Sequence, residues 1–378
     1  MKYTHTQIIF QTRINRCPIL GHRALCDYFT HSLTRLTQWS LMLVGFSFLI
    51  GCSSVRNVSI ETYAPADVTF PSNTFNVVVV NNAVLQPADF GHTTQQMNKK
   101  VEDYTMPTDS VLSAACKSLA SSIHQQRYFR KTLLLNSPIR QDELYYIDRK
   151  LSATQVDSIC NVVGAGAIIS IDRMLFNGKR SVVSHEGFLY GSQRVDVTAI
   201  IRAYIPNRAN PLATVQIVDS LEWVEASTNR ILLDQILPTA NEALRETAAY
   251  VSSKVYRNFV PNWVATERSY YSSIESRWKE ATAFAAKSKW PEANMHWMQL
   301  FNRTKSTLSK ARLASNIALS YEMMNEFKQA TDWVEKSEAL YLQQPKGKWN
   351  KEIARITLYK EILNERTRSD VRLNMQIN

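Results

Sequence analysis

Apolar residues between residues 74 and 261 recur at two spacings, and each spacing predicts a different kind of element. The run at residues 77–80 (VVVV) is β-branched and uninterrupted, which is typical of a strand buried on both faces. After Asp109, Ser152 and Pro238 the period is three to four residues, which predicts helices that begin at these positions. The letters SATQ at Ser152 also have the spacing of a capping box. By the same reasoning we expect strands at residues 131–135 and 167–171, and a hairpin formed by residues 195–203 and 213–217.

The remainder of the chain, residues 262–378, has helical spacing and contains a repeat. A shift of 37 residues places Ala281 on Ala318 and Ala293 on Ala330, with aromatic residues recurring between them. Small residues are needed where two antiparallel helices cross closely. This spacing resembles the tetratricopeptide repeat, which is a pair of such helices. The resemblance implies that the first helices form a face that binds partner segments, and we expect on that face Arg312, Ser315, Asn316 and Leu319.

The N-terminal part of the chain has an apolar run at residues 41–50 that is followed closely by Cys52. Its length fits the core of a signal peptide and falls short of the ~20 residues that a spanning helix needs. The letters LIGC that end at Cys52 resemble the bacterial lipobox. The resemblance implies cleavage before Cys52 and lipidation of its thiol, and several acyl chains give stable membrane anchoring. We therefore expect a lipoprotein-type signal peptide at residues 1–51 and a lipidated tether at residues 52–73.

The order of these segments resembles a known kind of protein over nearly the whole mature chain. The lipobox, the letters YAPADVTFP from Tyr63, the α/β region and the helical repeats together resemble uncharacterised lipoproteins of Bacteroidota. The fold class that follows is α+β. An N-terminal α/β sandwich-type domain with a mixed sheet, at residues 74–261, precedes an all-α domain with tetratricopeptide-like repeats at residues 262–378. In such lipoproteins an acidic run after the cysteine directs surface export. Its absence after Cys52 favours an outer-membrane protein that faces the periplasm.

Composition narrows the range of functions. The chain has 378 residues, is 45% hydrophobic and 20% charged, and can therefore bury ordinary cores. Its formal charge is +11, but from Cys52 onward 39 basic and 32 acidic residues leave only +7. This excess is spread along the chain, so no basic block marks a nucleic-acid groove. We expect the membrane and other envelope proteins as partners, and no nucleic acid.

Residue types that could carry chemistry are scattered. Cys116 and Cys160 follow the lipobox without a CxxC spacing, so we expect no metal site, while a disulfide between them stays open. The pair His185-Glu186 could serve as an acid/base pair or as metal ligands, but no third group accompanies it. Sequences typical of phosphate-binding loops, serine hydrolases and zinc proteases are absent from the sequence, and no cofactor is expected.

Three functions are therefore compared. The first is a non-enzymatic, membrane-anchored scaffold that binds other proteins through its tetratricopeptide-like repeats. The second is an accessory lipoprotein that activates an envelope machine, for cell-wall synthesis or secretion, through its α/β domain. The element order of that domain resembles penicillin-binding-protein activators and the curli-secretion lipoprotein, which is an analogy of fold alone. The third is a hydrolase with an unrecognised site, which ranks last.

Overall fold

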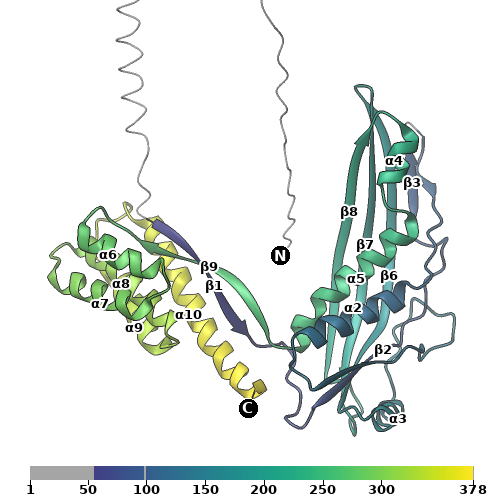
Figure 1. Ribbon diagram of the computed structural model, residues 1–378, viewed down its shortest axis with the longest axis horizontal. Helices are drawn as coiled ribbons and strands as arrows, with labels where there is room; N and C mark the ends of the chain where they lie inside the picture. The colour runs from purple at the N-terminus through teal and green to yellow at the C-terminus, as the bar shows by residue number, and fades with distance from the viewer. Residues whose placement is uncertain (1–54, 98, 378) are drawn as a thin grey trace, which may run out of the picture. The chain divides into compact units, whose positions relative to one another are not determined.

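The computed structural model describes residues 55–97 and 99–377 (Figure 1). The expected signal peptide and Cys52 lie outside these residues. The strands are β1 (Val55–Ala64), β2 (Asn76–Asn81), β3 (Thr93–Gln96), β4 (Glu102–Asp103), β5 (Lys131–Leu134), β6 (Ala167–His185), β7 (Phe188–Tyr204), β8 (Ala213–Ser227) and β9 (Asn262–Tyr271). The helices are α2 (Val111–Gln125), α3 (Ala153–Val163), α4 (Arg230–Ile236), α5 (Ala240–Phe259), α6 (Ser276–Ala285), α7 (Trp290–Arg303), α8 (Thr307–Met323), α9 (Phe327–Leu342) and α10 (Asn350–Ile377).

A mixed sheet forms the α/β domain, which confirms the fold class expected from the sequence. Strand β2 lies between β5 and β6 and is parallel to both. Strands β6, β7 and β8 form two successive antiparallel hairpins, and β3 pairs in parallel with the far half of β6. Strand β4 pairs with β3 in the antiparallel sense. The predicted hairpin is therefore β7–β8.

Strand β6 runs much further than the expected strand at residues 167–171. Directly after the predicted end at Ile171 comes Asp172, a residue type that rarely lies inside a strand. The structure buries Asp172 completely and places a bulge between Ile171 and Arg173. The buried carboxylate accepts hydrogen bonds from Ser170, Tyr204 and Arg202, among others. These bonds compensate for burial of the charge, so the strand continues.

Helices cover both faces of the central strands. Val77 and Val79 share one hydrophobic core with α2 and α5, while Val78 and Val80 share another with α3. Alternate residues of a strand point to opposite faces, so α2 and α3 lie on opposite sides of the sheet. Figure 1 shows α2 and α5 side by side across one face. The prediction that residues 77–80 are buried on both faces is confirmed.

The starts of α3 and α5 follow local sequence chemistry, whereas the start of α2 does not. Ser152 caps α3 through the predicted capping box, and Gly164 ends that helix with φ of 67°, a left-handed conformation that glycine adopts without steric cost. Thr239 and Glu242 form a second capping box at α5. Asp109, however, is not the cap of α2. The structure places Ser110 there, with φ of 61° and no capping bond from its side chain.

Residues 55–64, assigned from the sequence to a tether, instead form strand β1. This strand pairs along its whole length with β9, from Val55 opposite Tyr271 to Ala64 opposite Asn262. The tether interpretation was wrong for this stretch because the pairing partner lies about two hundred residues further along the chain. For the same reason the region after residue 261 begins with a strand and becomes helical only at α6.

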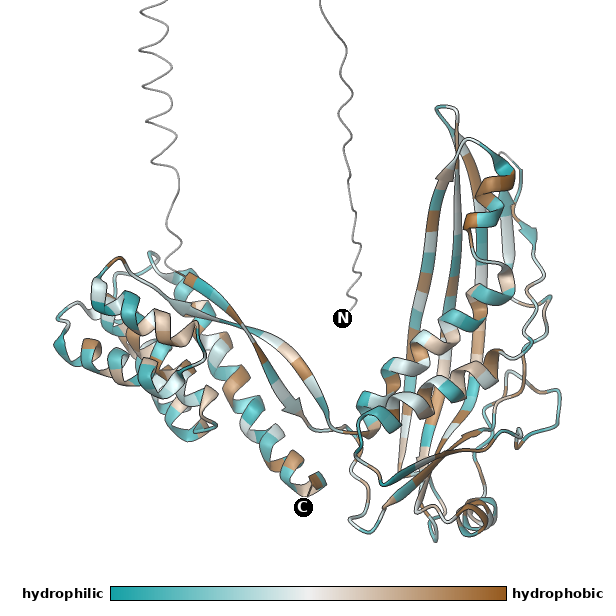
Figure 2. Cartoon of the chain, in the orientation of Figure 1, coloured by the Kyte–Doolittle hydropathy of each residue, from teal (hydrophilic) through white to brown (hydrophobic). Residues whose placement is uncertain are grey.

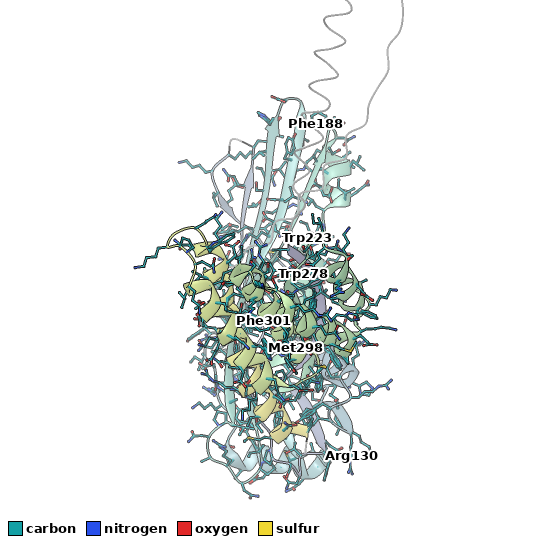
Figure 3. All side chains as sticks on the ribbon, turned by 90° about the vertical axis from the view of Figure 1, so that its left-hand side faces the viewer. Arg130, Phe188, Trp223, Trp278, Met298 and Phe301 are labelled. Atoms are coloured by element: carbon teal, nitrogen blue, oxygen red, sulfur yellow. The ribbon has the colours of Figure 1, made fainter. Side chains whose placement is uncertain are left out.

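The helical region contains two successive antiparallel pairs, α6–α7 and α8–α9, followed by the long helix α10. The repeated alanines Ala281, Ala293, Ala318 and Ala330 are all fully buried, as expected for residues at close helix crossings. Figure 3 shows Trp278, Met298 and Phe301 within this region. Trp278 and Phe301 belong to its hydrophobic core, and Met298 packs against that core.

No helix of residues 55–97 and 99–377 combines the length and the hydropathy needed to cross a bilayer.

Candidate functional site

A cleft lies where the parallel strands β2 and β5 end. The helix that follows β2 in the chain, α2, covers one face of the sheet, and the helix that follows β5, α3, covers the other face. Adjacent parallel strands whose following helices diverge in this way leave a crevice at their carboxyl ends, and open α/β sheets bind their ligands in such crevices. The topology alone therefore marks the ends of β2 and β5 as the first place to examine.

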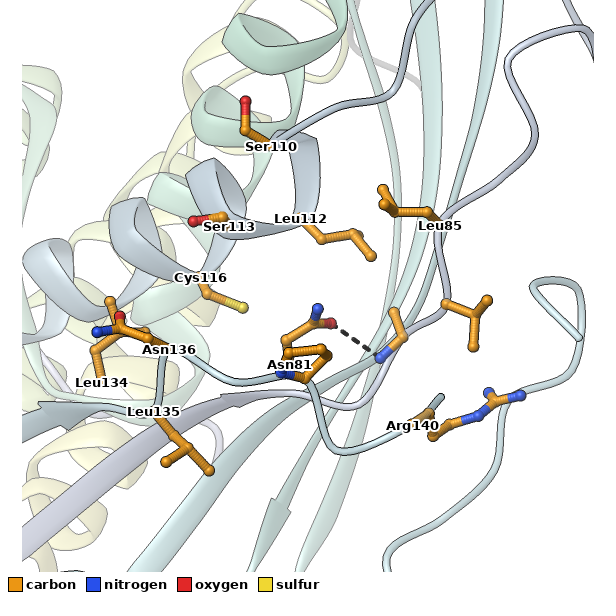
Figure 4. A pocket seen from close by; sticks show the side chains of 13 residues that line it. Asn81, Leu85, Ser110, Leu112, Ser113, Cys116, Leu134, Leu135, Asn136 and Arg140 are labelled. Carbon is orange, nitrogen blue, oxygen red and sulfur yellow. Dashed lines mark hydrogen bonds between the residues drawn. The ribbon is translucent and has the colours of Figure 1, made fainter. Parts of the chain in front are cut away.

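The cleft encloses about 340 Å³. Figure 4 shows Leu112 and Cys116 of α2 on one side and Asn81 and Leu85 on the chain that leaves β2. The Asn81 side-chain oxygen accepts a hydrogen bond of 3.0 Å from the Ala83 backbone amide. The Asn81 amide nitrogen has no acceptor among the described residues. The other lining residues are Ala83, Val84, Ser110, Ser113, Leu134, Leu135, Asn136, Pro138 and Arg140.

Arg140, which lines the cleft, is paired with groups of its own loop. Its guanidinium donates hydrogen bonds of 3.0 and 2.6 Å to the two Asp142 oxygens, and further bonds to the carbonyls of Leu144 and Ile147. Hydrogen bonds from Arg140 lower the pKa of the Asp142 carboxyl to about 2. Arg140 therefore folds the loop after β5, and its charge is neutralised before any ligand arrives.

The single thiol in the cleft is not an activated nucleophile. Cys116 is 3% exposed, and burial raises the pKa of its thiol to about 12. The thiolate is the reactive form of cysteine, so this group stays protonated near neutral pH. Cys160 belongs to α3 on the opposite face of the sheet. Both thiols are free, which answers the question that the sequence left open about a disulfide.

The first turn of α2 presents unused backbone donors to the cleft. Ser110 does not cap the helix, and the backbone amides of Leu112 and Ser113 have no acceptor among the residues that the structure describes. The N-terminus of a helix carries a partial positive charge of about half an elementary charge. None of the lining residues is acidic. The cleft is therefore apolar over much of its wall and offers hydrogen-bond donors without a competing carboxylate.

The four residues predicted to bind a partner do not form an open face. Ser315, Asn316 and Leu319 are 5%, 0% and 1% exposed. The Asn316 side chain is bound to the end of β9, because it accepts from the Tyr271 amide and donates to the Tyr271 carbonyl, both at 2.7 Å. Arg312 is half-buried, with its guanidinium 5.5 Å from the centre of the Tyr271 ring. Three of the four residues are therefore buried: Asn316 is held by strand β9, which the sequence analysis did not foresee, and Leu319 belongs to the core of the helical region.

Exposed apolar side chains instead gather at the far end of the α/β domain. Figure 2 shows hydrophobic residues on α4, and Figure 3 places Phe188 at the end of the long hairpin. Ile231 is 69% exposed and Phe188 is 46% exposed. Sequence reasoning missed this surface because β6 was predicted too short and α4 was not predicted. These side chains lie on two faces, because Val182 and Gly191 face α4 and their strand neighbours therefore point away from it. We call both groups together the apolar end, and it comprises Val183, Phe188, Tyr190, Ile231, Leu232 and Ile236.

The pair His185-Glu186 lies in the tight turn between β6 and β7. The His185 Nε2 atom is 3.6 Å from a Glu186 oxygen, and both side chains are largely exposed. Within residues 55–97 and 99–377 there is no group of three His, Cys, Asp or Glu side chains that could hold a metal ion. The turn thus supplies two neighbouring exposed side chains and, among the described residues, no third group beside them that could hold a metal.

Comparison with known proteins supports this architecture. The mixed sheet followed by a helical region defines a two-part α+β protein. The chain belongs to the family described as "Domain of unknown function (DUF8603)", which matches residues 75–271. Residues 279–365 match a second family, "Domain of unknown function (DUF6340)". Neither description names a lipoprotein or a tetratricopeptide repeat.

Two further comparisons add no argument about function. No curated protein matches the chain. A solved structure described as "Crystal structure of uncharacterized protein" is 10% identical and covers 49% of this chain and 91% of its own. Its TM-score is 0.19, which is too low to support any inference.

Proposed function

We propose that the protein is a membrane-anchored, non-enzymatic interaction protein of the bacterial cell envelope, lipidated at Cys52 and facing the periplasm. The observation that supports the non-enzymatic part of this proposal is the chemistry of the cleft. Its arginine is neutralised by Asp142 and its thiol is protonated. A site lined in this way can bind a ligand, but its lining includes no carboxylate or histidine that could activate the Ser110 or Ser113 hydroxyl to transform one.

The helical region supports a scaffold role, although in a different way from the one expected. The pairs α6–α7 and α8–α9 resemble tetratricopeptide units in length and in their buried alanines. Because β9 covers the inner side of α8, this region is proposed to stabilise the β1–β9 ribbon rather than to bind a partner through Arg312.

The second candidate, an accessory lipoprotein that acts on an envelope machine through its α/β domain, is favoured by the apolar end. Several exposed large apolar side chains at one end of a folded domain are a feature of protein contact surfaces. The apolar end belongs to the α/β domain. We therefore propose this domain as the part that touches the partner, with the identity of the machine left to experiment.

The anchoring and the contact surface can be tested in one strain. The full chain and a Cys52→Ala variant are expressed in a related bacterium, membranes are fractionated, and the mature N-terminal peptide is read by mass spectrometry. An acylated peptide that begins at Cys52, and is lost in the variant, supports the anchor. An intact Met1 terminus would contradict it.

A photo-crosslinking residue at position 188 is then compared with one at position 342. Phe188 and Leu342 are both exposed, at 46% and 65%, but Leu342 belongs to α9. Defined crosslinks from position 188 alone support contact through the α/β domain. Crosslinks from position 342 alone would return the role to the helical region.

A further inference from the structure

We propose that the cleft at the ends of β2 and β5 binds a small monocarboxylate with an apolar body. This goes beyond the proposed interaction role and does not depend on membrane anchoring. The argument begins with location, because the cleft occupies the switch point of the sheet, where ligands of open α/β sheets bind. Its volume of about 340 Å³ falls within the range of small-molecule sites.

The apolar residues that line the cleft indicate that most of the ligand is apolar. Leu85, Leu112 and Leu134 line the cleft together with four more apolar residues, Ala83, Val84, Leu135 and Pro138. Leu112 is 3% exposed and belongs to the domain core, whereas Leu85 is 45% exposed. An apolar body of about a dozen non-hydrogen atoms would cover these groups and release the water from them.

The unpaired N–H donors of the cleft and the absence of acidic lining residues indicate that the polar group of the ligand is an anion. The Asn81 side-chain amide, the Leu112 amide and the Ser113 amide lack acceptors among the described residues, and all three residues line the cleft. Donors of this kind, at the positive end of α2, favour an anionic oxygen acceptor. A carboxylate meets this requirement. A cation does not, because nothing that lines the cleft is acidic and Asp142 is already held by Arg140.

The test uses three probes with one body and three headgroups. These are 4-phenylbutyrate, 4-phenylbutan-1-ol and 4-phenylbutylamine. Each is titrated calorimetrically into the purified full chain in a mild detergent, with the detergent buffer alone as the blank. At typical ligand efficiencies a probe of this size binds with a Kd of about 1 mM. The expected order of affinity is carboxylate, then alcohol, with the amine weakest.

Two variants connect binding to this cleft. Ser113→Trp places a large ring at the rim and should abolish binding, whereas Ser121→Trp, on an exposed part of the same helix outside the cleft, should leave it unchanged. Asn136→Asp adds one negative charge at an exposed rim position with almost no change of size. It should weaken the carboxylate about threefold or more and spare the alcohol.

Each outcome decides the proposal. Selective carboxylate binding that Ser113→Trp removes supports it. Failure of all three probes to bind overturns the site. Equal binding of the amine and the carboxylate overturns the headgroup assignment, and binding that survives Ser113→Trp overturns the location.

Discussion

Glu322 is a completely buried carboxylate on which the packing of the helical region depends. Arg268 of β9 donates to both of its oxygens, at 3.0 to 3.2 Å, and Arg366 of α10 donates at 2.7 Å. The Tyr359 hydroxyl donates a further bond of 2.7 Å. One negative charge therefore joins α8, α10 and the ribbon strand β9, and balances two arginines that are largely shielded from water.

The variant Glu322→Gln keeps the size of this side chain and removes its charge. Removing one partner of a buried ion pair costs about 3–5 kcal/mol, because the remaining charge stays unpaired. Arg366 keeps 20% of its side-chain exposure, which argues for the lower limit of about 3 kcal/mol. At this size such a loss lowers the melting temperature by roughly 10 °C.

The measurement is urea unfolding of the full chain followed by far-ultraviolet circular dichroism, with calorimetry for the melting temperature. Glu361→Gln is the matched control, since Glu361 is exposed on the same helix α10 as Arg366 and should change stability by less than about 0.5 kcal/mol. A loss below about 1 kcal/mol in Glu322→Gln would refute the reasoning. It would mean that the two arginines find water or other partners once the carboxylate is gone.

Three further predictions concern the α/β domain. Burial raises the pKa of Cys116 to about 12 and that of Cys160 to about 11, so iodoacetamide at pH 8 should modify both thiols only after urea unfolding. The modification is read by peptide mass, and rapid labelling of Cys116 in the native protein would mean that the cleft opens. A Cβ atom at Gly178 would overlap the buried Met106 sulfur, so Gly178→Ala should cost about 1–3 kcal/mol in urea unfolding, and an unchanged midpoint would show that Met106 repacks freely. Hydrogen bonds from Arg140 lower the pKa of Asp142 to about 2. The amides of the loop at residues 138–149 should therefore be protected from hydrogen exchange above about pH 4 and lose this protection as the pH falls through 2. Asp142→Asn should remove the protection already at pH 5, and identical exchange in the variant would contradict this account.

Much of the secondary structure could be predicted because the sequence patterns that determine it involve residues close together in the chain. The four valines at residues 77–80, the capping box at Ser152 and the alanines of the helical repeats each depend on neighbours close in sequence or on one short period. In these cases the propensity and the packing favour the same element.

The failures share one physical cause, which is dependence on distant partners. Strand β1 is stable only with β9, and β6 can include Asp172 only because Arg202 and Tyr204 of the neighbouring strand donate hydrogen bonds to its carboxylate. The burial of Asn316 was not foreseen for the same reason, since its side chain is bound by a strand that the sequence analysis did not predict. The cleft could not be predicted either, because it requires knowing that α2 and α3 take opposite faces.

The pairing of β1 with β9 has a consequence for how the chain is divided. Ala64 and Asn262 face each other at one end of the ribbon, so their Cα atoms are about 5 Å apart. Everything between them leaves the ribbon and returns to nearly the same point. In this sense the α/β domain is an insertion, and the helical region is a host assembled from two separate pieces of chain. A two-residue turn that joins Ala64 to Asn262 would close the gap. The host should then fold without its insert, while the polypeptide that leads from the expected anchor at Cys52 would still enter the host first.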